Sequence, residues 1–360
     1  MKDKNADFGN TQVLIVGGAG FVGSNLTRMI LDSSETVKVT VVDNLMSAEE
    51  SNLPESKRLQ FLKGSISSDD ILKQVKDEYD YVFHIATYHG NQSSIHDPLA
   101  DHANNTFTTL RLFEWLKSFK RVKKVVYSSA GCSVAEKTFG EASATEEKEY
   151  TNIKHDSPYS ISKIVGEFYS VYYFNQHQLP TVRARFQNVY GPGEILGAGQ
   201  WRGTPATVWR NVTPTFIYKA LHNQPIPLEN EGLATRDFIY VEDICLGLMA
   251  CALKGKPGEV YNIASGKETS IADLAKEIVS LAKSTSSIQF LPKRNWDNSG
   301  KRYGSTEKSK QELGFEAKVN LHEGLIQTIA WTRSRMPLIE DCIAKHGKEM
   351  KHIGAALEAK

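Results

Sequence analysis

Short runs of β-branched and other apolar residues alternate with longer amphipathic stretches through the first half of the chain. The short runs predict strands, and the longer stretches, in which apolar positions recur every three or four residues, predict helices. This alternation is typical of a parallel sheet covered by helices. The predicted strands are residues 12–16, 37–42, 59–62, 81–85, 124–127 and 181–186, and the clearest predicted helices are 103–118 and 157–175.

The pattern changes after residue 188. Residues 191–214 are rich in Gly, Pro and Trp and show no regular period, so we interpret them as the start of a second lobe. The apolar run 237–241 predicts a return to the first lobe, before a helix at 271–282 and a strand at 288–291. The predicted division is a first domain of residues 11–187 with 236–265 returning to it, a second lobe of 188–235 and 266–333, and a helical tail, 334–360, without an assigned role.

Charge and composition limit the class of partner. The chain has 43 Lys and Arg against 42 Asp and Glu, and this balance argues against nucleic acid or an anionic membrane as the partner. Its four cysteines show neither CxxC spacing nor a disulfide framework, so we expect a reducing, cytoplasmic setting. No run of about 18 apolar residues predicts a membrane span. The ten histidines lack metal-ligand spacing, so no metal is predicted.

A glycine-rich turn follows the first predicted strand. Gly17 permits a tight turn, Gly20 allows a close approach to a pyrophosphate, and Gly23 allows the following helix to pack closely on the strand. The free N–H groups at the start of that helix would face the anion. Glycine triplets also occur in ordinary turns, but here strand, glycines and helix come in the order that a dinucleotide site needs.

Asp43 ends the second predicted strand, about 20 residues after the glycines, where a carboxylate can accept hydrogen bonds from the ribose of an adenosine. Asn44 and Leu45 follow it, so no arginine stands ready to neutralise a 2′-phosphate. NAD is therefore predicted over NADP. The alternative is an aspartate that only caps a turn.

Tyr159 and Lys163 lie four residues apart at the start of a predicted helix, so their side chains share one face. A nearby ammonium stabilises a phenolate, and we expect Lys163 to lower the pKa of Tyr159 towards that of a general base. Such a pair could remove a proton from an alcohol as hydride leaves its carbon. By spacing alone, an ordinary surface pair remains the alternative.

Taken together, these motifs resemble the extended short-chain dehydrogenase/reductase family, specifically its nucleotide-sugar epimerases and dehydratases. The resemblance covers residues 11–333 and rests on the glycine turn, Asp43, the sequence His84-Ile85-Ala86, Asn105, Ser128-Ser129, the Tyr159–Lys163 pair, and the segments 185–192 and 236–241. It implies an α/β fold, with a Rossmann-type doubly wound parallel sheet that binds NAD and a smaller mixed α/β C-terminal lobe that binds a nucleoside diphosphate sugar.

The resemblance also implies roles for individual residues. Tyr159 would take the proton of the sugar 4-hydroxyl, and Lys163 would hold the nicotinamide ribose. It places both among the cofactor-binding residues, together with Gly17, Gly20, Phe21, Val22, Gly23, Asp43, Asn44, Ser65, Ile66, Ala86, Thr87, Asn105 and Ser128. In the second lobe it implies a diphosphate site of Asn188, Asn211, Arg236 and Arg302, with Arg294 as an alternative second arginine. For Arg236 an ion pair with Asp237 or Asp243 stays open.

Several positions depart from the family pattern. Ala130 stands where members usually place the Ser or Thr that binds the reacting oxygen. Ser129, Ser133 or the Cys132 thiol could substitute; Ser129 is the expected one, although it could merely cap the strand end. Gly131 and Cys132 replace the Asp-Glu pair of the sugar 4,6-dehydratases. Ser65 replaces an aspartate near the adenine.

The function predicted from the resemblance is C4 epimerisation of a UDP-sugar through a transient 4-keto intermediate, for a surface polysaccharide precursor. The alternatives are a nucleotide-sugar dehydratase or reductase, and a catalytically impaired protein that binds NAD and sugar nucleotide. The insert with Trp201 and Trp209-Arg210 is either a lid that sets sugar specificity or an ordinary surface loop. Helices 103–118 and 157–175 resemble those through which family members form homodimers by a four-helix bundle.

Overall fold

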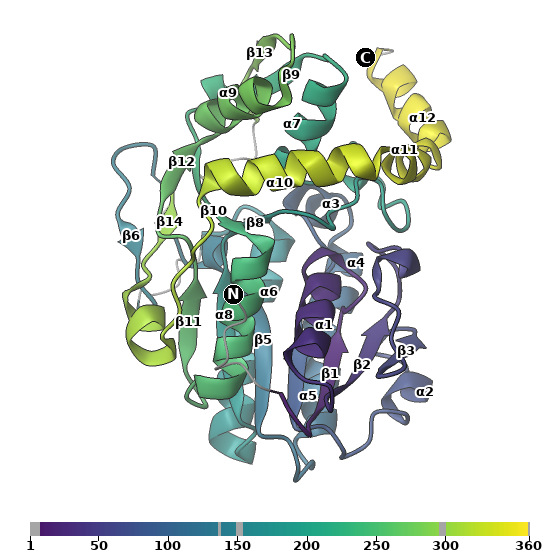
Figure 1. Ribbon diagram of the computed structural model, residues 1–360, viewed down its shortest axis with the longest axis vertical. Helices are drawn as coiled ribbons and strands as arrows, with labels where there is room; N and C mark the ends of the chain where they lie inside the picture. The colour runs from purple at the N-terminus through teal and green to yellow at the C-terminus, as the bar shows by residue number, and fades with distance from the viewer. Residues whose placement is uncertain (1–7, 136–137, 149–153, 295–299, 359–360) are drawn as a thin grey trace.

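A seven-stranded parallel sheet with helices on both faces forms one half of the molecule (Figure 1). The computed structural model describes residues 8–135, 138–148, 154–294 and 300–358. The strand order across the sheet is β11-β7-β5-β4-β1-β2-β3. These strands are β1 (Gln12–Val16), β2 (Lys38–Asp43), β3 (Leu59–Lys63), β4 (Tyr81–His84), β5 (Lys124–Ala130), β7 (Thr181–Phe186) and β11 (Val260–Ile263). The prediction of a Rossmann-type doubly wound α/β fold is confirmed.

Both faces of this sheet are apolar because each is covered by helices. Along β1, Val13 and Ile15 pack with one pair of helices, and the alternate residues Leu14 and Val16 pack with the other pair. The first pair is α1 (Phe21–Ser33) and α8 (Val241–Lys254), and the second is α5 (Thr108–Leu116) and α6 (Pro158–His177). This two-sided burial explains why the strands are continuous apolar runs in the sequence.

The predicted strands and helices agree closely with the structure, with two informative differences. The predicted helix 103–118 begins as a π-helical segment, His102–Phe107, before α5. The strand predicted to rejoin the first lobe, β10 (Thr235–Tyr240), instead pairs with β8 (Asn188–Tyr190) and β12 (Glu268–Ser270) in a separate small sheet. The chain returns to the large sheet through α8 and β11, because β11 pairs with β7.

The second half of the molecule lies above the carboxyl ends of the central strands (Figure 1). A separate core joins the small sheet, the β9–β13 pair and three helices. These elements are α7 (Val212–Leu221), β9 (Ile226–Glu229), α9 (Ile271–Ala282), β13 (Ile288–Leu291) and α10 (Leu321–Ser334). The remaining short elements are α2 (Asp69–Leu72), α3 (Asn91–His96), α4 (Pro98–Asp101), β6 (Ala144–Thr145) and β14 (Tyr303–Gly304).

The C-terminal tail is helical, as predicted, and packs against the irregular insert. Its helices are α11 (Met336–Ala344) and α12 (Gly347–Glu358). Ile339 and Cys342 of α11 form a small apolar cluster with Ile195, Leu196 and Ala198 of the insert. The tail therefore supports the segment that covers the cavity. Within the described part of the chain, no helix has the length and hydropathy needed to cross a bilayer.

Candidate active site

A cavity of about 800 Å³ opens at the carboxyl ends of the central strands. Its position follows from the strand order, since β2 and β3 lie on one side of β1 whereas β4 and β5 lie on the other. Loops that leave neighbouring strands in opposite directions create a crevice at this point, and ligands of open parallel sheets bind there. The second half of the molecule closes the crevice from above, so one cavity is lined by both halves.

The glycine turn between β1 and α1 has the backbone that a dinucleotide site requires. Gly17 has a φ of +92°, and a Cβ there would lie 2.4 Å from the backbone nitrogen of Ala86. A Cβ on Gly23 would lie 2.1 Å from the carbonyl oxygen of Gly17. Gly20 is the N-cap of α1 and has no side chain to satisfy the first N–H groups, so these remain available to a pyrophosphate. The turn, with Phe21 and Val22 beside it, lines the cavity and fits a dinucleotide.

Asp43 lies at the end of β2 and lines the same cavity. Its carboxylate accepts hydrogen bonds from the backbone N–H groups of Ala19, at 3.0 Å, and Leu45, at 2.8 Å. Burial raises the pKa of Asp43, and these backbone donors oppose that rise. The carboxylate thus braces the glycine turn as well as facing the predicted ribose site. Asn44 also lines the cavity beside it.

The ends of β3 and β4 complete the predicted dinucleotide wall, with one exception. Ser65, Ile66, Ala86 and Thr87 all line the cavity. Asn105 does not; the structure places it behind the wall, where its side-chain oxygen accepts from the Thr87 hydroxyl, at 3.1 Å, and its amide donates to Asp101, at 2.7 Å. The direct cofactor contact expected of Asn105 is therefore replaced by a supporting contact to the loop that carries Thr87.

Tyr159 and Lys163 lie on the first two turns of α6, next to the end of β5. The Lys163 ammonium is 5.8 Å from the centre of the Tyr159 ring and donates to the carbonyl oxygen of Ser128, at 2.9 Å. Both side chains line the cavity beside Ser128. The Ser128 carbonyl fixes the ammonium at the floor of the site.

The pKa values of this pair differ from the sequence-based expectation. Burial raises the pKa of Tyr159 well above its ordinary value, with a further rise from Cys132 and Asp101, and the hydrogen bond with Thr87 only partly opposes it. Burial also lowers the pKa of Lys163 to about 8. In the nucleotide-free chain the pKa of Tyr159 is thus raised and not lowered, because the loss of water dominates.

The end of β5 does not present an obvious substitute for the missing hydroxyl at Ala130. Ala130 lines the cavity, as expected. Ser129 lies at the cavity wall, but its hydroxyl donates to the buried carboxylate of Glu167, which also binds Arg185, at 2.8 Å. The Ser129 hydroxyl therefore has a strong acceptor inside the protein, and its expected bond to the reacting oxygen would compete with that contact.

The residues predicted to hold a diphosphate all line the cavity, on the side of the second lobe. Arg236 donates to the carbonyl oxygens of Thr235, at 2.6 Å, and Gly300, at 2.7 Å. Arg294 forms an ion pair with Glu229, at 2.5 Å. The structure thus brings Arg236, Arg294 and Arg302, with Asn188 and Asn211, to one wall.

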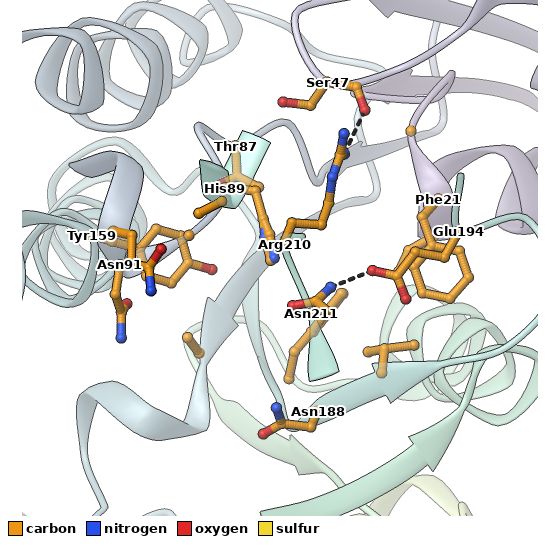
Figure 2. Close-up of a pocket in the computed structure, with 18 of the residues that line it drawn as sticks. Phe21, Ser47, Thr87, His89, Asn91, Tyr159, Asn188, Glu194, Arg210 and Asn211 are labelled. Atoms are coloured by element: carbon orange, nitrogen blue, oxygen red, sulfur yellow. Dashed lines mark hydrogen bonds between the residues drawn. The ribbon is translucent and has the colours of Figure 1, made fainter. Parts of the chain in front are cut away.

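The insert crosses from the second lobe to the loop after β2. Arg210 donates to the carbonyl oxygen of Ser47, at 3.0 Å (Figure 2). The Gly199 N–H donates to Glu49, at 2.9 Å. Trp209 and Arg210 line the cavity. Trp201 does not line the cavity; its ring packs on His346 of the tail, with centroids 5.7 Å apart.

The polar side chains of this cavity that sequence reasoning did not single out include His89 and Glu194 (Figure 2). Glu194 accepts a hydrogen bond from Asn211, and burial raises its pKa to about 7. His89 lies in the loop after β4, with its ring centre 6.2 Å from that of Tyr159. The only sequence signal for His89 was its position just beyond the carboxyl end of a central strand, which is where ligands of such sheets bind.

Comparisons with known proteins show which proteins this chain is similar to. The NAD dependent epimerase/dehydratase family matches residues 13–264. A crystal structure of the Bordetella bronchiseptica enzyme WbmF in complex with NAD⁺ and UDP is 59% identical, with a TM-score of 0.86, and the match covers 96% of this chain and 99% of that one. A UDP-glucose 4-epimerase of Thermotoga maritima, solved with UDP-glucose, is 28% identical with a TM-score of 0.80, covering 90% and 99% of the two chains.

Curated relatives include enzymes with more than one activity. A trifunctional UDP-glucose 4,6-dehydratase/UDP-4-keto-6-deoxy-D-glucose 3,5-epimerase/UDP-4-keto-L-rhamnose-reductase of Arabidopsis thaliana is 26% identical over 330 residues, which is 89% of this chain. The match covers 46% of the Arabidopsis protein, so this chain spans about half the length of the first curated relatives. Epimerases and dehydratases therefore both stand among the similar proteins.

Proposed function

This chain belongs to the NAD-dependent epimerase/dehydratase family, and we propose that within the family it is an epimerase that inverts C4 of a UDP-linked sugar. NAD is its cofactor, in agreement with the sequence-based prediction. The epimerase activity and the UDP-sugar substrate are the two proposals about the cavity.

One observation carries this proposal: the glycine turn, the Tyr159–Lys163 pair and the arginine wall line a single cavity. A dinucleotide on the glycine turn would extend from Asp43 towards Tyr159. A nucleoside diphosphate would find the guanidinium groups of Arg236 and Arg302 on the facing wall, and such groups bind phosphates as planar forks. The sugar would then lie between the two, against the Tyr159 phenol.

Tyr159 is the proton carrier of the proposed reaction. As the phenolate, Tyr159 would take the proton of the sugar 4-hydroxyl as the ketone forms, and the resulting phenol would return that proton when the alcohol forms again. Lys163, with a pKa of about 8, stays mainly protonated at neutral pH and provides a fixed positive charge beside the phenol. Lys163 alone does not offset the effect of burial on the Tyr159 phenol. NAD, when bound, supplies the hydride acceptor and donor at C4 and, in its oxidised form, a further positive charge.

The positions of the carboxylic acids in the cavity support epimerisation over dehydration as the proposed reaction. Among the described residues that line it, the carboxylic acids are Asp43, Glu49, Glu194 and Glu229, and none lies on the turn after β5. That turn, Gly131–Ser133, is where the dehydratases carry an Asp-Glu pair. Each of the four acids already binds another group of the protein. Loss of water from the sugar would need a free acid and base that this turn does not supply.

The proposal is tested by incubating the purified protein with UDP-glucose, UDP-galactose, UDP-N-acetylglucosamine and UDP-glucuronate. We expect the C4 epimer of at least one of them by chromatography, without added NAD and without net change in nicotinamide absorbance. A dehydrogenase would reduce added NAD. Saturable binding of these compounds without any new sugar would favour the alternative of a catalytically impaired binding protein.

Running the reaction in D₂O separates epimerisation from dehydration. Hydride that leaves C4 and returns to C4 introduces no deuterium on carbon, whereas loss of water across C5 and C6 followed by protonation does. We expect a product mass equal to that in H₂O after back-exchange, and a carbon-bound deuterium would contradict the proposal. Tyr159→Phe is the matched variant, because it removes only the hydroxyl and should abolish turnover while binding of UDP is kept.

We also propose that the product serves a surface polysaccharide and that the reaction takes place in the cytoplasm. The first of these rests on the family resemblance. The second is supported by the four cysteines, all of which are free, three of them buried with pKa values that burial raises. Mass spectrometry of the nucleotide sugar that copurifies with the protein would test the first, since a common metabolic sugar would argue against it.

Homodimerisation is part of the same proposal. Exposed apolar side chains lie on α4, the π-helical segment and α6, three elements that contact one another, and a contiguous apolar patch of this kind indicates an interaction surface. Its residues, with exposed fractions, are Leu99 (79%), Phe107 (42%), Ile161 (50%), Phe168 (62%) and Tyr172 (52%). Phe168→Glu should convert the dimer to a monomer in light scattering, whereas the exposed Phe290→Glu should not. A wild-type monomer would refute the dimer.

A further inference from the structure

The imidazole of His89 is a polar group of the active-site wall that the proposed chemistry has not used. The residue lines the cavity, and both ring nitrogens are shielded from solvent without a hydrogen-bond partner among the described residues. A buried polar atom left without a partner costs about 1–3 kcal/mol. A side chain that carries two such atoms at a cavity wall therefore indicates that a ligand supplies the partners.

The loop that carries His89 is held in place on both sides. The backbone N–H of Tyr88 donates to the side-chain oxygen of Asn105, at 2.6 Å, and the Asn105 amide donates back to the Tyr88 carbonyl, at 3.4 Å. The imidazole itself packs edge-on against the Tyr159 ring, at an interplanar angle of 61° (Figure 2). The position of the imidazole relative to the phenol is therefore fixed by the fold.

The electrostatic surroundings keep this imidazole neutral. Burial, together with the positive charges of Arg202, Arg210 and Lys163, lowers the pKa of His89 to about 3. A neutral imidazole has one N–H donor and one acceptor nitrogen. It can thus bind two neighbouring polar positions of a sugar ring, one that accepts and one that donates.

The end of β5, the strand next to β4, explains why a hydrogen-bond donor such as the His89 imidazole is needed here. β4 pairs with β5, so the loop after β4 and the end of β5 lie side by side at the cavity. Ala130, at the end of β5, lacks the hydroxyl that would bind the reacting oxygen, and the Ser129 hydroxyl already donates to Glu167. The Thr87 hydroxyl already donates to Asn105, Ser133 does not line the cavity, and Cys132, which does, has only a thiol, a weak donor. Among the described residues of the β5 end, a strong donor to the reacting oxygen is therefore lacking.

We propose that His89 contacts the sugar directly, donating its N–H to the oxygen on the reacting carbon in place of the hydroxyl absent at Ala130, while its second nitrogen accepts from the neighbouring substituent. This inference rests on the proposed function, because it concerns the sugar that Tyr159 deprotonates. It makes His89 a catalytic residue and a determinant of which ring substituents are accepted.

The test compares His89→Phe, which keeps a flat ring but removes both nitrogens, with His89→Gln, which restores an amide donor. For His89→Phe we expect kcat to fall about 100-fold, the effect of removing one donor to a developing oxyanion, while NAD content and affinity for UDP stay within about twofold of the wild type. His89→Gln should recover at least about tenfold of the loss. His322→Phe, on an exposed helix position, is the matched control and should keep full activity.

A second arm tests whether His89 replaces the hydroxyl missing at Ala130. Ala130→Ser in the His89→Phe background should raise kcat by about tenfold, whereas the same change in the wild type should have little effect. Thermal unfolding of each variant identifies a loss that comes from misfolding. Equal kcat for His89→Phe and the wild type would overturn the inference. A parallel loss of NAD or of UDP affinity would also overturn it, because the imidazole would then bind a phosphate.

Binding measurements keep this inference separate from the proposed function. If the wild type converts none of the four UDP-sugars, the proposed function fails, and His89 is then judged by calorimetry. The affinity that the sugar adds, which is the ratio of the Kd for UDP to that for UDP-N-acetylglucosamine, should fall in His89→Phe by about tenfold. An unchanged ratio would overturn the role of His89.

Discussion

Replacing Lys163 by methionine should change how the stability of the nucleotide-free chain depends on pH. The side chain is 3% exposed, and burial lowers its pKa from 10.5 to about 8, although Asp101 and Cys132 act in the opposite direction. One pKa unit corresponds to about 1.4 kcal/mol. Keeping the ammonium charged inside the folded chain therefore costs about 3 kcal/mol at any pH below 8, and methionine removes this cost.

The sign of the effect follows from proton linkage. Between about pH 8 and 10.5 the unfolded chain holds the proton of Lys163 and the folded chain has lost it, so the contribution of Lys163 to stability becomes less unfavourable as pH rises. The stability of Lys163→Met relative to the wild type should thus fall by about 3 kcal/mol from neutral pH to pH 10.5. The lost hydrogen bond to Ser128, worth about 1 kcal/mol, shifts the difference by a constant.

The assay is urea unfolding, followed by circular dichroism, at several pH values across this range. Lys276→Met provides the control, since its side chain is 68% exposed and should show no such trend. The change in the difference between variant and wild type, and not its absolute size, is the measured quantity. A difference that stays constant with pH would show that the folded chain leaves Lys163 with an ordinary pKa, and the account of the buried ammonium would be refuted.

Two further predictions concern the dinucleotide turn and the insert. Gly23→Ala should lower NAD affinity by about tenfold to a hundredfold, because its Cβ would lie 2.1 Å from the Gly17 oxygen and displace the turn. Fluorescence titration with NAD measures this affinity. An effect no larger than that of the control Gly140→Ala would contradict the prediction. Trp201→Ala should leave KM for UDP-sugars unchanged, whereas Trp209→Ala should raise it, since of these two tryptophans Trp209 lines the cavity. A larger rise in KM for Trp201→Ala than for Trp209→Ala would mean that Trp201 reaches the substrate.

The positions of the strands and of the dinucleotide turn could be predicted from the sequence because they depend on local periodicity. Residues 12–16, 181–186, 271–282 and 288–291 were predicted with the same bounds that the structure shows. A glycine turn between strand and helix constrains its own backbone, and a four-residue spacing on a helix places two side chains together wherever the helix lies. These features need no knowledge of the rest of the chain.

The identity of a strand's partner is not local. The apolar run 237–241 was predicted to return to the first lobe, but the strand it overlaps, β10, pairs with β8 and β12, because the chain has already crossed to the second lobe. From the sequence, Trp201 and Trp209 were equal candidates for the cavity, because both belong to the same insert. In the structure the Trp201 ring packs on His346 of the tail, more than 100 residues later in the chain, and does not line the cavity. A hydrophobic pattern shows that a residue is apolar, but it does not show which part of the chain packs over that residue.

The strands of the sheet, the cofactor turn and the Tyr159–Lys163 pair could be read from local patterns, since each is encoded by residues close to one another in the chain. Packing between distant segments sets how strongly the pair is buried, places Asn105 behind the wall, and brings His89 against Tyr159 without a hydrogen-bond partner among the described residues. Desolvation and hydrogen-bond satisfaction depend on every group that packs around an atom. Those groups come from segments far apart in the chain, so no local pattern contains them.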